Sequence, residues 1–150
     1  MLFRSSSSRN SFRTNESATR EAITLALETY GRIDALVLNA GVLDPMGRID
    51  SPDITTDSWR SHFDVNFFSM IYTVQSSLPT LRASKNGGRI IFISSGAAVS
   101  GTPTWGPYNA SKAAMNSFCR SVYPPRTAQP YKIVHKLMPT LGRLRARNQI

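Results

Sequence analysis

The chain has 150 residues, 41% of them hydrophobic and 18% charged, and a formal net charge of +9. Such a length and composition suit one globular domain with a real core and exclude a disordered chain. No apolar run approaches the roughly 20 residues that cross a bilayer, and the single cysteine, Cys119, fits a reducing compartment, so we expect a cytoplasmic, non-membrane protein.

The charges are unevenly distributed along the chain. All nine acidic residues lie between Glu16 and Asp64, so both ends are basic. We expect residues 1–14 to be a disordered or misassigned segment; an organelle transit peptide is the alternative, because serines and arginines occur there without any acid. Residues 139–150 are expected to be a basic, solvated tail. No aromatic platform accompanies its charge, so we expect no nucleic-acid partner.

The first predicted element is a helix that Thr14 or Ser17 can cap and that Gly31 ends. Its apolar residues fall on one face: Ile23, Ala26, Leu27 and Tyr30. Residues 35–38 follow as a short strand in which every residue is apolar, a pattern typical of parallel strands that are buried on both faces.

A polar loop then leads to a long helix, with Asn66 beside its apolar stripe. The stripe consists of Phe67, Met70, Ile71, Val74 and Leu78. After Gly87 and Gly88, residues 90–93 predict a second buried strand, which runs into Ser95.

A third helix is predicted to contain Tyr108 and to stop at the pair Pro124-Pro125. We interpret Cys119 on this helix as a core thiol rather than a nucleophile, and residues 132–138 predict a last strand. The core face of the helix consists of Ala114, Met115, Phe118 and Val122. This alternation of helices and strands predicts an α/β fold with a doubly wound parallel sheet.

Polar residues follow two of the predicted strands. Asn39 and Gly41 come directly after the first strand, and Ser95 ends the second. Because ligands of such sheets gather at the carboxyl ends of the strands, we expect these residues to converge on one edge.

Tyr108 and Lys112 lie four residues apart on a predicted helix, so their side chains stack on one face. A tyrosine ordinarily titrates near pH ~10. A cation beside it lowers the pKa of the phenol, which can then exchange a proton with a substrate oxygen. The pair alone is common by chance, so its neighbours must decide its meaning.

Asn39-Ala40-Gly41, Asn66, Ser95 and Tyr108-x-x-x-Lys112, in that order, resemble the short-chain dehydrogenase/reductase family. The resemblance covers about residues 14–122, and the segments 63–69 and 93–98 most resemble its sepiapterin-reductase-like and benzil-reductase-like branch. It implies a partial NAD(P)-binding domain over residues 15–138, a Rossmann-type sheet lacking the N-terminal glycine-rich strand–turn–helix.

The resemblance implies an NAD(P)-dependent oxidoreductase that reduces a carbonyl compound to an alcohol, or the reverse. Tyr108 would be the acid/base, and Lys112 would bind the ribose hydroxyls of the cofactor and lower the pKa of Tyr108. Ser95 would orient the carbonyl. Asn66 would kink its helix and hold a water in a proton relay.

Further positions carry expectations from the same resemblance. Asn39, Ala40 and Gly41 would face the cofactor, for which the branch favours NADP over NAD. Val99 and Trp105 would line the substrate pocket and suit an aromatic or hydrophobic ketone or diketone. The helices that carry Asn66 and Tyr108 would form a homo- or hetero-dimer interface. We expect no metal site.

The chain also departs from the family. None of its nine glycines forms the Gly-x-Gly of the pyrophosphate turn. In the family's sheet order the missing first strand would pair with residues 35–38, and its loss would leave an open, apolar edge. The alternative is therefore a catalytically inactive truncated remnant, or a gene-model fragment, that associates with a full-length relative.

Overall fold

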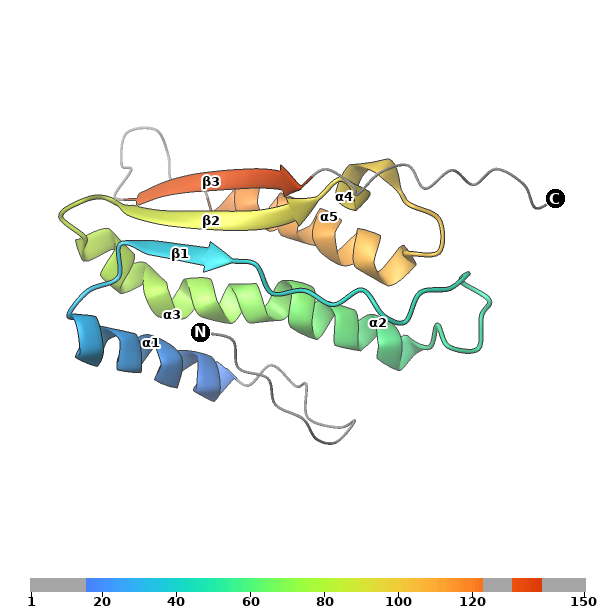
Figure 1. Cartoon of the computed structure of the whole chain (residues 1–150), viewed down its shortest axis with the longest axis horizontal. Coiled ribbons are helices and arrows are strands. Elements are labelled where there is room, and N and C mark those ends of the chain that lie inside the picture. The colour runs from blue at the N-terminus through green and yellow to red at the C-terminus, as the bar shows by residue number, and fades with distance from the viewer. Residues whose placement is uncertain (1–15, 123–130, 139–150) are drawn as a thin grey trace.

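The computed structural model of the chain describes residues 16–122 and the backbone of residues 131–138. Three parallel strands form one sheet in the order β1 (Ala35–Leu38), β2 (Gly88–Ser95) and β3 (Tyr131–Met138). All three strands point toward the side of the molecule where α2 (Thr56–Phe63) and α4 (Ala97–Ser100) lie (Figure 1). The predicted α/β fold with a partial parallel sheet is confirmed. The predicted segments 1–14 and 139–150 lie outside the described residues.

The first helix, α1 (Glu16–Tyr30), is where the sequence predicts it. Gly31 ends it with a φ of 72°, and its N–H donates to Leu27 O at 2.8 Å. The helix packs on α3 (Ser69–Ala83), but Tyr30, expected on the packed face, is 77% exposed. That part of the prediction is wrong: Tyr30 is the last residue of the helix, and its side chain lies in solvent.

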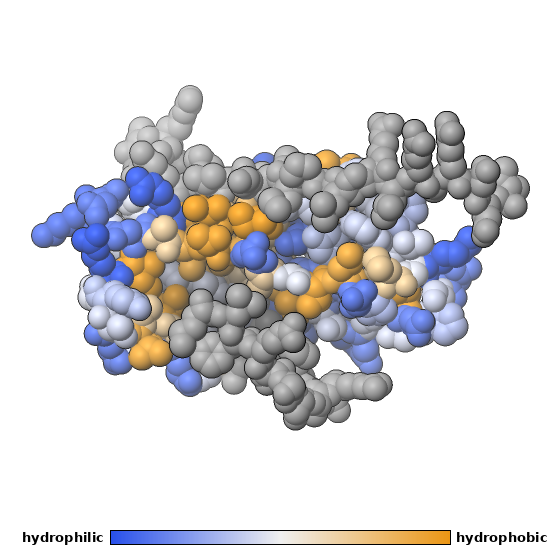
Figure 2. Space-filling model, viewed as in Figure 1, coloured by the Kyte–Doolittle hydropathy of each residue, from blue (hydrophilic) through white to orange (hydrophobic). Residues whose placement is uncertain are grey.

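Strand β1 differs from the expectation that residues 35–38 are buried on both faces. Leu36 and Leu38 point to the covered face of the sheet, whereas Ala35 and Val37 are exposed, Val37 by 57%. The strand is therefore buried on one face only, since successive side chains alternate between faces. An apolar area over β1 and β2 is visible in Figure 2. The sequence of a strand shows which side chains are apolar, but the elements that pack on the strand determine which of them are buried.

The long helix of the sequence is continuous but not uniform. Thr55 caps α2 by accepting a hydrogen bond from Ser58 N. Between α2 and α3, a π-helical turn η1 (Asp64–Phe68) widens the helix at Asn66. Such π turns are frequent at functional sites. The family resemblance implies a kink of the helix at Asn66, but no local residue pattern indicates a π turn there.

The predicted third helix is α5 (Gly106–Ser121), with Pro107 in its first turn. The short α4 before it was not predicted. The strand expected at 132–138 is confirmed as β3, which pairs with β2 along its whole length.

One hydrophobic core lies between the sheet and the helices. Strand residues such as Ile90 and Phe92 meet α3 and α5 on the same face of the sheet. The buried residues of this core are Leu38, Met70, Val74, Leu81, Ile90, Phe92, Met115 and Cys119. Cys119 is 3% exposed, and burial raises the pKa of its thiol, with an opposing effect from Arg120, so its predicted packing role is confirmed. Across residues 16–122 and 131–138, no helix has the length and apolarity to span a membrane.

Candidate active site

The carboxyl edge of the sheet brings together most of the residues that the sequence selected. Ser95 is the last residue of β2, and Asn39 and Gly41 follow β1. The helix α5 carries Tyr108 and Lys112 toward this edge, and η1 carries Asn66. A loop, a strand end, a π turn and a helix therefore each supply one part of the site.

Lys112 is a buried cation. Its Nζ donates to Ile93 O, in β2, at 3.2 Å, and the residue is only 4% exposed. Desolvation lowers the pKa of the ammonium below its ordinary value of 10.5. A Cβ added at Gly41 would lie 3.4 Å from Lys112 Nζ, so this glycine lets the loop after β1 approach the ammonium closely.

Tyr108 lies beside this cation. Lys112 Nζ is 5.8 Å from the centroid of the Tyr108 ring, within the range of a cation–π contact. The four-residue spacing therefore places both groups on one face of α5, as the sequence predicts. Tyr108 is only partly buried, so its ring is within reach of a ligand in the solvent.

Asn66 is fully buried and joins three segments. Its Oδ1 accepts from Val42 N at 2.7 Å, and its Nδ2 donates to Val42 O at 2.9 Å. The same Nδ2 donates to Ser111 Oγ at 3.0 Å, and Ser111 Oγ donates to Tyr108 O at 2.8 Å. The Asn66 amide and the Ser111 hydroxyl thus connect three segments: η1, the first turn of α5, and the loop that follows β1.

Ser111 was missed by the sequence reasoning. It is fully buried, and it contacts both Asn66 and the backbone of Tyr108. Its position three residues after Tyr108 allows the hydroxyl to bond back to a carbonyl of the preceding turn. Exposed helical serines show the same spacing, so burial is what distinguishes this one.

Ser95 is 8% exposed, and its Oγ accepts from Ala97 N at 3.2 Å. That contact leaves the hydroxyl hydrogen free to be directed at a ligand. The neighbouring Ser94 donates to Asn116 Oδ1 at 2.6 Å and fastens α5 to β2. This bond fixes the position of the end of β2 relative to the helix that carries Tyr108.

The remaining predicted residues differ in exposure. Asn39, Ala40 and Gly41 are exposed after β1. Val99, on α4, is 75% exposed, while Trp105 is partly buried with its ring against Tyr108. The described residues contain no cluster of three or more His, Cys, Asp or Glu that could hold a metal ion.

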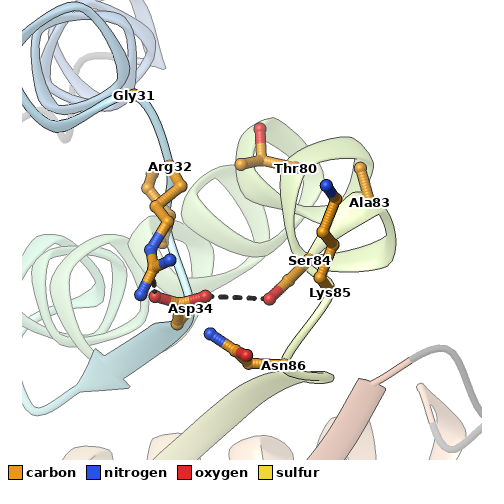
Figure 3. A pocket seen from close by; sticks show the side chains of 9 residues that line it. Gly31, Arg32, Asp34, Thr80, Ala83, Ser84, Lys85 and Asn86 are labelled. Atoms are coloured by element: carbon orange, nitrogen blue, oxygen red, sulfur yellow. Dashed lines mark hydrogen bonds and ion pairs between the residues drawn. The ribbon is translucent and has the colours of Figure 1, made fainter.

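A pocket of about 430 Å³, lined in part by polar side chains, lies at the opposite end of the sheet (Figure 3). It is bordered by the C-terminal ends of α1 and α3. There Asp34 pairs with Arg32 at 2.9 Å and accepts from Ser84 Oγ at 2.9 Å. These bonds tie the connection before β1 to the end of α3. None of the predicted site residues lines this pocket.

Comparison with known proteins identifies the family of the chain. A sequence profile described as short chain dehydrogenase matches residues 12–134. The chain belongs to the short chain dehydrogenase family. The resemblance read from the sequence is confirmed.

Individual proteins also match parts of the chain. An uncharacterized oxidoreductase of Schizosaccharomyces pombe is 45% identical over 97 residues, 65% of this chain and 38% of that protein. A benzil reductase ((S)-benzoin forming) of Saccharomyces cerevisiae is 40% identical over 97 residues, 63% of this chain and 37% of that protein. A solved short chain dehydrogenase/reductase of S. cerevisiae matches with a TM-score of 0.74 at 32% identity, covering 84% of this chain and 47% of that one. The chain thus spans less than half the length of these relatives.

Proposed function

We propose that the chain carries the proton-transfer site of an NAD(P)-dependent oxidoreductase that interconverts a carbonyl compound and an alcohol. The observation that carries this proposal is the buried ammonium of Lys112, 5.8 Å from the centroid of the Tyr108 ring. Burying a charged lysine costs free energy unless the charge is paired. Among the described residues, no carboxylate lies within ion-pairing distance of Lys112, so we infer that its charge serves a function.

The chemistry of the donors fits the nicotinamide ribose of such a cofactor. The ammonium of Lys112 has three N–H groups, and Ile93 O accepts one of them. The others are available for two vicinal hydroxyls, and the exposed Asn39, Ala40 and Gly41 border the same edge. When bound, the nicotinamide supplies or accepts the hydride.

The side chains supply the proton and the orientation. Tyr108 donates the phenol proton to the carbonyl oxygen, or accepts it in the reverse direction. Ser95 donates its free hydroxyl hydrogen to the same oxygen and fixes the direction of the carbonyl group. Lys112 favours the phenolate through its positive charge.

Asn66 supports a route by which the proton is replaced. A Cβ added at Gly41 would lie 3.4 Å from both Asn66 Oδ1 and Lys112 Nζ, so the two atoms border the same point of the loop. A water hydrogen-bonded near this point would connect Lys112 with the solvent.

The similarity to a benzil reductase supports an aromatic diketone as the substrate class. The partly buried ring of Trp105 beside Tyr108 offers an apolar surface for such a compound. NADP and NAD both fit the lysine equally, and we favour NADP from the branch resemblance alone.

The test measures oxidation of NADPH or NADH by the chain in the presence of benzil and of small diketones. We expect turnover, and we expect Lys112→Met to abolish it and to weaken binding of the reduced cofactor, followed by its fluorescence. Lys85→Met removes an exposed lysine at the far end of the sheet and serves as the matched control. Equal activity of Lys112→Met and the control would contradict the proposal.

A second candidate is a non-catalytic chain that associates with a full-length relative. Two observations favour it: the outer edge of β1 is unpaired in the described sheet, and the sequence contains no Gly-x-Gly turn for a pyrophosphate. Phe68, 39% exposed, borders an apolar groove on α2 and η1, which supports an interface through these helices. Size-exclusion chromatography tests whether the chain is monodisperse, and a titration with NADPH tests whether it binds the cofactor. A monodisperse chain that binds NADPH tightly would exclude this second candidate.

A further inference from the structure

The loop between α4 and α5 is held at several points. Asn109 Nδ2 donates to Thr102 O at 2.7 Å, and Gly47 N donates to Thr104 O at 2.9 Å. Trp105 N donates to Thr102 O at 3.3 Å, and Trp105 O accepts from Asn109 N at 2.8 Å. The loop is therefore anchored both to the first turn of α5 and to the separate loop that follows β1.

The anchoring imposes an unfavourable backbone conformation on Thr104. Its φ is 66°, in the left-handed region that a β-branched residue rarely adopts. Such strain persists only where the surrounding structure determines it. Here Gly47 forms a parallel bridge with Trp105, and its N–H bonds to the carbonyl of Thr104 itself. A close approach of two loops thus fixes the conformation of the residue just before Trp105.

The consequence is a defined contact between two rings. The centroids of Trp105 and Tyr108 are 5.9 Å apart with an angle of 90° between the planes, the edge-to-face arrangement that aromatic pairs favour. Lys112 contacts the same Tyr108 ring from the next turn of α5. The orientation of the phenol is therefore restrained from the loop as well as from its own helix.

We propose that Trp105 is a positioning residue that orients the Tyr108 ring, with Gly47 and the strained Thr104 holding the indole in place. This inference rests on the proposed function, in which the phenol exchanges a proton with the substrate oxygen. An indole in this arrangement transfers no proton itself. It acts by keeping the phenol within hydrogen-bonding reach of a bound carbonyl, which proton transfer requires.

A role of Trp105 in lining the substrate pocket predicts a different kinetic effect. Loss of a lining residue weakens substrate binding and raises KM. Loss of a positioning residue leaves KM nearly unchanged and lowers kcat, because the misoriented phenol affects the chemical step.

The first arm of the test needs no turnover. The full chain is labelled with 3-fluorotyrosine, and loss of one of its five tyrosines in Tyr108→Phe assigns the ¹⁹F resonance of Tyr108. We expect Trp105→Leu to shift this resonance and to make the ring more mobile in ¹⁹F relaxation. Trp105→Phe, which retains an aromatic edge, should restore most of the wild-type relaxation. The same kind of change at an exposed aromatic residue at the end of α1, Tyr30→Leu, should leave it unaltered.

The second arm measures the reduction of a diketone by the same variants. We expect kcat to fall about 10-fold in Trp105→Leu with KM nearly unchanged, and to recover in Trp105→Phe. Unaltered ¹⁹F relaxation in Trp105→Leu, or a rise in KM alone, would overturn the inference. If the wild-type chain shows no turnover, the proposed function fails, and the relaxation data still decide whether Trp105 orients the ring.

Discussion

Asn66 and Val42 exchange two hydrogen bonds, in which a side-chain amide pairs with a backbone N–H and C=O as a neighbouring strand would. The amide reaches Val42 from the π turn η1, and it also donates to Ser111 on α5. The two bonds from the Asn66 side chain thus fix the position of the loop after β1 beside Lys112.

We predict that Asn66→Ala destabilises the chain by about 2–4 kcal/mol, because it leaves polar groups of Val42 and Ser111 without their partner. Asn66→Asp should also be destabilising, since it replaces the donating amide nitrogen that Val42 O and Ser111 accept from. Urea unfolding measures both effects. Asn86→Ala removes an exposed asparagine and should change the free energy of unfolding by less than about 0.5 kcal/mol. Equal stabilities of the Ala variants at the two sites would show that the Asn66 bonds contribute nothing.

The buried ammonium of Lys112 predicts a specific dependence of stability on pH. Burial lowers its pKa in the folded chain below the ordinary 10.5, so the unfolded chain binds more protons between these two pKa values. Its contribution to the free energy of unfolding therefore rises with pH across this window and is lost as pH falls through the lowered pKa. Lys112→Met should remove the rise.

The thiol of Cys119 contributes in the opposite direction, because its pKa is raised and its stabilising effect is lost above its ordinary value of 9.0. At each pH, we subtract the free energy of unfolding of Lys112→Met from that of the wild type. The effect of Cys119 cancels in this difference, since both chains contain the thiol. The difference should increase with pH. A flat difference would mean that the ammonium is solvated in the folded chain.

Two glycines are predicted to tolerate substitution differently. A Cβ added at Gly88 would fall on the backbone carbonyl oxygen of Leu81 and 2.8 Å from Leu81 Cβ, so Gly88→Ala must separate β2 from α3. We expect a cost of about 1–3 kcal/mol or more. Gly31→Ala meets no atom within 4 Å but retains a φ of 72°, for which we expect about 1 kcal/mol. Thermal unfolding compares the two, and a smaller cost at Gly88 would contradict the close packing of β2 on α3.

The exposed face of β1 predicts an effect on solubility. Val37→Lys places a charge on an apolar edge strand, so we expect less light scattering in concentrated solution and a change in stability within about 0.5 kcal/mol. Leu36→Lys is the matched control on the covered face, where Leu36 packs against the core, and it should destabilise the chain strongly. Equal scattering by wild type and Val37→Lys would indicate that this face does not drive association.

Local sequence patterns predicted the elements and the grouping of the site, because these depend on short-range spacing. The four-residue interval between Tyr108 and Lys112 defines a helical face, and the polar residues after two apolar strands define one sheet edge. The roles of these residues stay predictions.

What the sequence did not reveal depends on contacts between distant segments. The exposure of Val37 follows from which elements pack on β1, and the burial of Ser111 follows from the approach of η1 to α5. The left-handed conformation of Thr104 results from its bond to Gly47, 57 residues earlier by numbering. No local pattern marks a threonine for that conformation.

The central claim is that the Tyr108 phenol transfers the proton, and Tyr108→Phe tests it most directly because it removes one oxygen and leaves the ring. NADPH oxidation with benzil is compared in wild type, Tyr108→Phe and Tyr72→Phe, the last removing a hydroxyl from α3. We predict a fall in kcat of at least about 100-fold in Tyr108→Phe with cofactor binding retained, and none in Tyr72→Phe. Equal kcat values in wild type and Tyr108→Phe would contradict the account.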